Sequence, residues 1–229
     1  MSSLVLGRIG RTRKQDLTEA GKTGARDAWQ VLANGGVATV CAAFSGILFA
    51  FWPPLPGYSP LLRADIWMVA FCGAYAAATA DTWGTEIGTL ARQMPRSILT
   101  FKPIAAGLSG GITAVGTLAE IAGAIFIAVF ALIAFALAYA ASGLFLNPNR
   151  VAIAVVAGGI VGALVDSLLG ASMQELRHCP ACDRSCETDP HACGAPTRRI
   201  RGLPGFSNDL VNFAATLVGA GTALILAAV

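Results

Sequence analysis

Five long apolar stretches divide this chain, and they constrain its fold more than any other feature. They cover residues 29–51, 66–91, 104–142, 151–174 and 206–228. A helix that crosses a bilayer needs about 20 apolar residues, so four of the stretches fit one crossing each. Only 13% of the residues are charged, against about 25% in soluble domains. The sequence therefore predicts an all-α, polytopic membrane helix bundle that forms a single transmembrane domain over residues 1–229.

The third stretch is too long for one upright helix. It begins with the run Gly107-Leu-Ser-Gly-Gly111, and glycine costs about 1 kcal/mol in a helix interior. Irregular backbone at membrane depth is tolerated only where protein or a cavity covers it. We therefore expect a re-entrant segment or half-helix near residues 104–115, followed by a helix from about 116 to 141. The bundle then has about five transmembrane helices.

The distribution of positive charge predicts the orientation of the chain. Fourteen of the sixteen Lys and Arg residues fall in the segments 8–26, 92–102 and 175–205, and the remaining two, Arg63 and Arg150, lie in the connections between them. Positively charged loops stay in the cytoplasm. We therefore expect the N-terminus in the cytoplasm and the C-terminus outside the cell (inner) membrane. The first residues are basic and polar, and they do not resemble a secretory signal.

Polar side chains interrupt the apolar stretches at a similar depth. With a rise of 1.5 Å per residue, Asp81 and Asp166 each lie roughly 16 Å from the next cytoplasmic arginine, and Asp209 and Asn34 roughly 12 Å from the preceding one. A carboxylate inside a bilayer costs several kcal/mol unless it has partners, so such acids are functional candidates. The pattern predicts one polar pocket that opens to the cytoplasm. Structural polar anchors or transport-path residues remain the alternative interpretation.

The residue types around these acids suit metal-assisted phosphate chemistry. Hard cations such as Mg²⁺ prefer carboxylate oxygens, and a glycine-rich turn ahead of a helix offers backbone N–H groups to a phosphate. The expected Mg²⁺ ligands are Asp81, Asp166 and Asp209, and the expected nucleotide-binding residues are Ser109, Gly110 and Gly111, helped by Lys102. Close helix packing is the simpler explanation of the glycines, and a topology-setting charge is the simpler explanation of Lys102.

Further polar residues extend the predicted pocket. Glu86 lies about 140° from Asp81 on an ideal helix, so both face one site only if Gly84 distorts that helix; otherwise Glu86 is a solvated residue. The amides expected to bind substrate or nucleotide are Asn34, Asn208 and Asn212. Asn208 and Asp209 could instead cap the last helix, and Asn34 could make an interhelical hydrogen bond. Glu120, inside the third stretch, receives no role.

These motifs resemble one known membrane family. The motifs that carry the resemblance lie at residues 26–36, 80–88, 109–111, 166–171 and 208–212. The family occurs in bacteria, archaea and eukaryotes and was long a domain of unknown function. It includes the plant plastid phytyl-phosphate kinase and a human transmembrane protein. The resemblance implies a CTP-dependent kinase that converts an isoprenyl (phytyl- or geranylgeranyl-type) monophosphate to the diphosphate, with the catalytic residues Asp81, Glu86, Asp166 and Asp209.

Two other functions stay open. A looser likeness extends to dolichol kinase and to CTP-dependent cytidylyltransferases, which act on a lipid phosphate and release pyrophosphate. A transporter would need a midplane site reachable from both sides; residues 80–88 and 165–171 are weakly similar to each other, but the polar groups favour one side. The expected partners are CTP, an isoprenyl phosphate and the bilayer, not nucleic acid. Homo-oligomer formation is left open.

The loop 175–205 carries a separate signal. Its Cys and His residues combine a C-x-x-C pair with a second group, which is the ligand spacing of a small zinc site. The candidate ligands are Cys179, Cys182, Cys193 and either Cys186 or His191. Because disulfides are uncommon in the cytoplasm, we expect a small cytoplasmic insert with a structural zinc ion; free or redox-active thiols and disulfides are the alternatives. Cys41 and Cys72 are expected to be packing residues.

Overall fold

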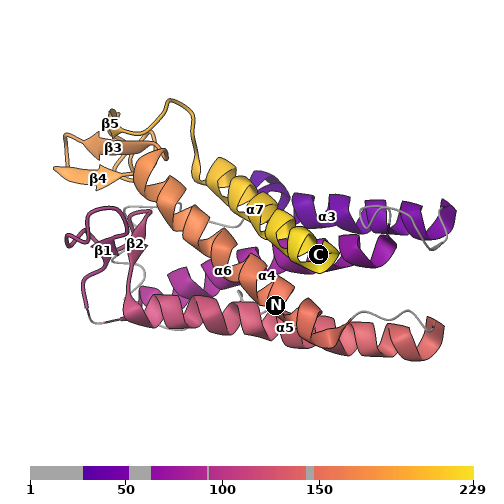
Figure 1. The fold of residues 1–229 in the computed structure, drawn as a ribbon. Helices are drawn as coiled ribbons and strands as arrows, with labels where there is room; N and C mark the ends of the chain where they lie inside the picture. Colours follow the sequence, from indigo (N-terminus) through magenta and orange to yellow (C-terminus); the bar gives the residue numbers. More distant parts are fainter. Residues whose placement is uncertain (1–27, 52–62, 92, 143–146) are drawn as a thin grey trace.

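In the part of the chain that the structure describes, five long helices form an elongated bundle with two small β-sheets at one end (Figure 1). The computed structural model describes residues 28–51, 63–91, 93–142 and 147–229. The helices are α3 (Ala28–Phe51), α4 (Ala64–Gly88), α5 (Ala114–Ser142), α6 (Pro148–Ser172) and α7 (Asn208–Ala228). The basic segment 8–26, on which the predicted orientation partly depends, lies outside the described residues.

Helix α4 is the centre of the bundle, because it packs against α3, α5, α6 and α7. Most of its buried residues are Ala or Gly, which lets the neighbouring helices approach closely. Within the described residues, the other four helices are long and apolar enough to cross a membrane. With 25 residues, α4 is about 37 Å long, and its neighbours cover most of its apolar surface in place of lipid. The prediction of a polytopic helical membrane bundle is confirmed.

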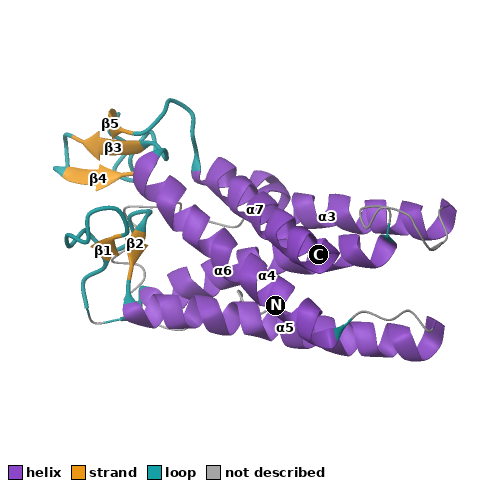
Figure 2. Cartoon of the chain, viewed as in Figure 1, coloured by secondary structure: helices purple, strands orange, loops and turns teal. Residues whose placement is uncertain are grey.

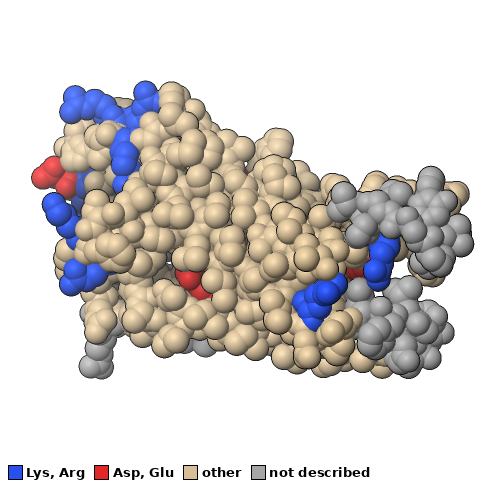
Figure 3. All heavy atoms as spheres, in the orientation of Figure 1, with Lys and Arg blue, Asp and Glu red and all other residues tan. Residues whose placement is uncertain are grey.

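The outer faces of the bundle are apolar, and the charges gather at its ends. Large hydrophobic side chains such as Phe49, Phe130 and Leu217 are exposed, as expected of surfaces that contact lipid. In Figure 3 most of the Lys and Arg atoms on the visible face lie over the end that carries the β-sheets, whereas the middle is almost free of charge. Arg63 and Arg150 stand at the starts of α4 and α6, at the opposite end.

Glycines bring α4, α6 and α7 into direct backbone contact. A Cβ atom added at Gly73 would lie 2.7 Å from the Gly219 carbonyl oxygen, and one added at Gly158 would lie 2.6 Å from that same oxygen. At Gly162 the added atom would come within 2.4 Å of the Ala77 Cβ. Small residues allow such approaches between membrane helices. These contacts fix the spacing of the three helices.

Replacement of Gly219 by Val should therefore destabilise the bundle. A Cβ at this position would meet the Ala77 Cβ at 2.7 Å and the Gly73 carbonyl oxygen at 2.9 Å, and overpacking typically costs about 1–3 kcal/mol. Gly221→Val is the matched control, because nothing lies within 4 Å of its added Cβ. In thermal unfolding of detergent-solubilised protein, Gly219→Val should lower the midpoint and Gly221→Val should not. Equal midpoints would contradict this account of the packing.

The segment before α5 differs from the expected half-helix. Strand β1 (Arg96–Ser97) pairs antiparallel with β2 (Gly111–Ile112), and the residues between them form turns and extended backbone (Figure 2). Gly107 and Gly110 have positive φ angles of 88° and 80°, a conformation that favours glycine and interrupts a right-handed helix. The segment therefore forms a short hairpin beside the end of the bundle, and the helical turn expected near 104–115 is absent from it.

A second sheet breaks the all-α pattern in the loop between α6 and α7. Strand β3 (Leu176–Cys179) lies between β4 (Arg184–Cys186) and β5 (Arg198–Arg201), with antiparallel pairing on both sides. We call residues 176–201 the knuckle. It lies beside the β1–β2 hairpin at the end of the bundle (Figure 1). The Cys-rich loop and the run 107–111, which we call the glycine-rich loop, are therefore neighbours in space.

Candidate functional site

A polar cavity of about 430 Å³ lies at the end of the bundle that carries the β-sheets. All five helices contribute to its lining, together with the hairpin and the knuckle. The predicted site residues that line it are Asn34, Asp81, Glu86, Ser109, Gly110, Gly111, Asp166, Asn208 and Asn212. The structure thus gathers residues from five separate sequence motifs into one pocket. Lys102 is exposed and Asp209 lies in the first turn of α7, and neither belongs to this lining.

Three carboxyl side chains from three helices meet in this pocket. Asp81 on α4 lies beside Asp166 on α6, and the charges of Asp81 and of Glu120 on α5 both act on Asp166. The Oδ2 atom of Asp166 is fully enclosed and has no hydrogen-bond partner among the described residues. Adjacent carboxylates repel each other unless they share a proton or bind a cation. The enclosed oxygen and the all-oxygen donor set therefore fit a hard divalent cation such as Mg²⁺.

Glu120 is a pocket residue that the sequence reasoning did not assign. Its side chain lies over Gly84, where an added Cβ would come within 2.5 Å of the Glu120 Cγ atom. From the sequence, Asp81 and Glu86 could face one site only if Gly84 distorted α4, but the helix runs through Gly84 without interruption; the glycine instead makes room for Glu120. Asp81 and Glu86 both line the pocket without that distortion. Glu120 lies about 9 Å into α5 at 1.5 Å per residue, and it lines the same cavity as Asp81 and Asp166.

Neutralising one of the three carboxyls should stabilise the metal-free protein. In the presence of a chelator, Asp166→Asn and Glu120→Gln each remove one like charge from the cluster, and the relief should be on the order of 1 kcal/mol. Their thermal midpoints should therefore rise above that of the unmodified protein.

Asp65→Asn is the control for this experiment. Asp65 accepts a 2.5 Å ion-pair hydrogen bond from Arg63 at the other end of α4, so its neutralisation removes an attraction and should lower the midpoint. A fall in midpoint for all three variants would show that Asp166 and Glu120 do not repel their neighbours.

Glu187 is the second pocket residue that the sequence did not reveal. It comes from the knuckle, and its Oε1 atom accepts a 2.9 Å hydrogen bond from the Ser109 N–H. Its Oε2 atom accepts a 2.8 Å hydrogen bond from the Gln174 side chain. Burial raises the pKa of the Glu187 carboxyl above its usual range, although the hydrogen bonds from Ser109 and Gln174 and the charge of Arg201 act against this. Nothing in its sequence position, directly after Cys186, indicated that it reaches the glycine-rich loop.

The glycine-rich loop packs tightly on the end of α6. A Cβ added at Gly110 would lie 2.4 Å from the Ala171 Cβ and 2.6 Å from the Ala171 backbone nitrogen. Gly170 faces Ser109 in the same way, with its added Cβ 3.1 Å from the Ser109 Cβ. Gly110 and Gly170 therefore allow close packing, and phosphate binding by Ser109, Gly110 and Gly111 stays a prediction. The Ser109 N–H, one of the groups expected to bind phosphate, donates to Glu187 in this structure.

The predicted amide residues differ in their surroundings. Asn34 donates a 2.9 Å hydrogen bond from Nδ2 to the Gln30 carbonyl within α3, so this hydrogen bond is not the interhelical one considered from the sequence. Asn208 and Asn212 both line the pocket from the first turns of α7. The N-cap of α7 is Ser207, which leaves Asn208 in the helix and corrects the expectation that Asn208 could be the cap.

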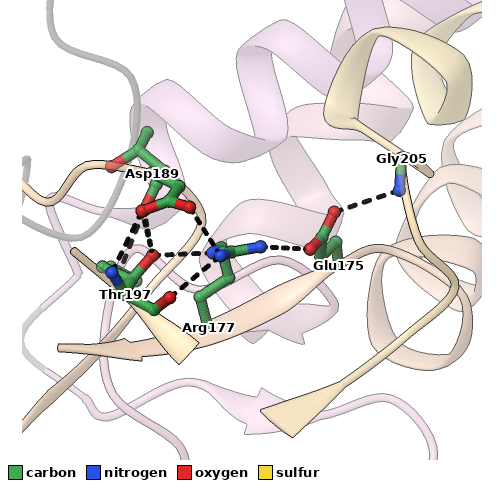
Figure 4. Close-up of polar contacts among 7 residues, drawn as sticks. Glu175, Arg177, Asp189, Thr197 and Gly205 are labelled. Atoms are coloured by element: carbon green, nitrogen blue, oxygen red, sulfur yellow. Dashed lines mark hydrogen bonds and ion pairs between the residues drawn. The ribbon is translucent and has the colours of Figure 1, made fainter. Parts of the chain in front are cut away.

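An ion-pair network ties the knuckle to the start of α7 (Figure 4). Arg177 donates to Asp189 at 2.6 Å and to the Thr197 hydroxyl at 2.6 Å, and it also pairs with Glu175. Glu175 in turn accepts a 3.1 Å hydrogen bond from the Gly205 N–H. Hydrogen bonds from Thr197 lower the pKa of Asp189 below its usual range. The network links β3 and β5 to the chain that enters the pocket at α7.

The structure also gathers four of the five predicted zinc ligands. The ligand atoms of Cys179, Cys182, His191 and Cys193 all lie within 4.8 Å of one another. Cys186 is not part of this group; its thiol instead donates to the Thr188 carbonyl at 3.7 Å. Of the two alternatives for the fourth ligand, the geometry therefore selects His191. Cys41 and Cys72 are buried among apolar residues of the helix interfaces.

The fold and the pocket define a class of protein: an integral membrane protein of several helices with an acidic pocket at one end of the bundle. Comparison with known families gives the particular one. The chain belongs to the integral membrane protein family DUF92, whose model matches residues 1–220.

Two of the curated proteins that are similar to this chain come from a plant and an archaeon. Protein PGR of Arabidopsis thaliana is 29% identical over 220 residues, which cover 95% of this chain and 75% of that protein. The uncharacterized membrane protein MJ0933 of Methanocaldococcus jannaschii is 36% identical over 104 residues, which cover 45% of this chain and 39% of that protein. No solved structure matches this chain. The comparisons confirm the family that the sequence motifs resemble.

Proposed function

We propose that this protein is a membrane-embedded kinase that transfers a phosphoryl group from CTP to an isoprenyl monophosphate and forms the diphosphate. The observation that carries the proposal is the meeting of Asp81, Glu120 and Asp166 in one polar cavity. Phosphoryl transfer depends mainly on positioning and on neutralisation of the charge that spreads over the phosphate oxygens. A pocket of carboxyl and amide side chains at the end of an apolar bundle suits that task.

In this proposal the three carboxyls hold Mg²⁺ in the pocket. Glu120 joins Asp81 and Asp166, and it is better placed for this role than Asp209, which lies outside the lining. When bound there, Mg²⁺ would offset the negative charge of the phosphate groups. Glu86 lines the same cavity and is available to bind or orient the acceptor phosphate.

The amide and glycine residues would bind the polar parts of both substrates. Asn208 and Asn212 project from one face of α7 into the cavity, where their amides can donate hydrogen bonds to phosphate or ribose oxygens. The isoprenyl tail would lie against the apolar outer surface of the helices, in the lipid. Because positively charged loops stay in the cytoplasm, the pocket end would face the cytoplasm, where CTP is available.

Product analysis tests this reaction directly. Purified full-length protein in lipid nanodiscs would be incubated with Mg²⁺, CTP labelled on either the α- or the γ-phosphate, and a panel of isoprenyl monophosphates. We expect CDP and an isoprenyl diphosphate that carries the γ-label. Release of pyrophosphate would instead identify a cytidylyltransferase. Absence of any CTP-dependent product across the panel would overturn the kinase proposal.

Single substitutions should locate the reaction in the acidic cluster. Asp166→Asn and Glu120→Gln should each lower the rate by about 100-fold or more, the order expected when a preorganised electrostatic contact is removed. The control is Asp183→Asn in the knuckle, because the Asp183 side chain is 97% exposed and Asn tolerates its positive φ of 51°. Full activity in Asp166→Asn protein would show that this cluster is not the reaction site.

A further inference from the structure

Four side chains of the knuckle form a compact group with the donor atoms of a zinc site. Cys179 ends β3, Cys182 lies in the turn before β4, and His191 and Cys193 follow in the loop before β5. Cys179 and His191 are buried, whereas Cys193 is exposed. Three thiols and one imidazole make up the Cys₃His set that is typical of structural zinc.

The distances between these atoms match a tetrahedron. With Zn–S bonds of about 2.3 Å and Zn–N bonds of about 2.0–2.1 Å, tetrahedral ligands are separated by about 3.8 Å between two sulfurs and about 3.6 Å between nitrogen and sulfur. In the structure Cys179 Sγ lies 3.7 Å from Cys193 Sγ, and the His191 Nδ1 atom lies 3.7 Å from Cys182 Sγ. Nδ1 and Cys193 Sγ are 3.1 Å apart. The four donors need little movement to bind one ion.

This group is connected to the pocket through Glu187. The segment 183–190 runs between the ligands Cys182 and His191, so an ion that holds both ligands fixes both ends of the segment. Glu187 lies within it and accepts the hydrogen bonds from Ser109 and Gln174. Ser109 in turn belongs to the loop that packs on Gly170 and Ala171 at the end of α6, the helix that carries Asp166.

We propose that Cys179, Cys182, His191 and Cys193 bind one zinc ion, and that this ion fixes the loop whose Glu187 holds the glycine-rich loop against the pocket. The three thiols lose their protons to solvent when the ion binds. Glu187 lines the pocket, and toward the glycine-rich loop it is a positioning residue, because it holds that loop through the Ser109 N–H. The second half of this inference concerns the pocket of the proposed kinase, but its readouts do not depend on kinase activity.

Metal analysis tests the ion. Full-length protein purified without chelator should contain one zinc per chain, and Cys182→Ser and Cys193→Ser should each lose it. Cys186→Ser is the matched control: this cysteine belongs to the same loop but not to the ligand group, so its variant should keep the zinc. Loss of zinc from Cys186→Ser alone, or absence of zinc from the unmodified protein after zinc addition, would overturn the site.

Thiol labelling of the unmodified protein guards against variants that fail to fold. Cys179, Cys182 and Cys193 should resist alkylation until a strong zinc chelator is added, and should then react together. Rapid alkylation of these thiols before chelation would contradict the zinc site. A mass deficit of two hydrogen atoms that a reductant restores would instead show a disulfide, and would also overturn the zinc site.

Hydrogen–deuterium exchange tests the connection to the pocket. The Ser109 amide should exchange slowly in the zinc-loaded protein and faster after chelation, because its acceptor Glu187 is no longer held in place. Glu187→Ala should give the faster exchange at Ser109 while it keeps its zinc. If chelation removes the zinc and leaves the exchange at residues 107–110 unchanged, the ion does not position this loop. Zinc content and exchange at residues 107–110 do not depend on kinase activity. A negative kinase assay would therefore contradict the proposed function and leave the zinc proposal standing.

Discussion

The contact of backbone with backbone at Gly73, Gly158 and Gly219 is the constraint on which the site depends. These glycines allow α4, α6 and α7 to pack without intervening side chains, and so they set the distance between the acidic residues further along the same helices. Asp81 and Asp166 meet because α4 and α6 meet. Helix α5 completes the cluster at Gly84, where the absence of a side chain admits Glu120. The acidic pocket is therefore a product of small-residue packing as much as of the acids themselves.

Much of this arrangement could be predicted from the sequence, because the depth of a side chain in a membrane helix depends mainly on how many residues separate it from the loop at the end of that helix. The rise per residue and the positions of the basic loops placed Asp81, Asp166, Asn34 and Asp209 at a common level, and the structure lines one cavity with the first three of them. Glu120 was left without a role because the sequence indicated no partner for it inside the third apolar stretch.

The contributions of the loops could not be predicted in this way. Glu187 reaches Ser109 across 78 positions of sequence, and its position follows from the pairing of β3 with its neighbours, for which the sequence offered no periodic signal. The hairpin before α5 was missed for a related reason: its glycines indicate a break in the helix, but positive φ angles at Gly107 and Gly110 are compatible with many turns. By contrast, the proposed zinc ligands of the knuckle are close together in the sequence, so their spacing alone indicated the site. It left open only whether Cys186 or His191 is the fourth ligand.

The central position of α4 has a consequence for how such a chain enters the membrane. Its surface is shared among four neighbouring helices, and it carries Asp65, Asp81 and Glu86 along its length. A helix of this kind gains little from lipid contact alone, since an acidic residue at the bilayer centre opposes insertion by about 2.5–3.5 kcal/mol. Its residence in the bilayer is therefore a collective property of the bundle: α4 becomes stable only as the later helices arrive to enclose it, so that membrane integration and folding of this protein are one process.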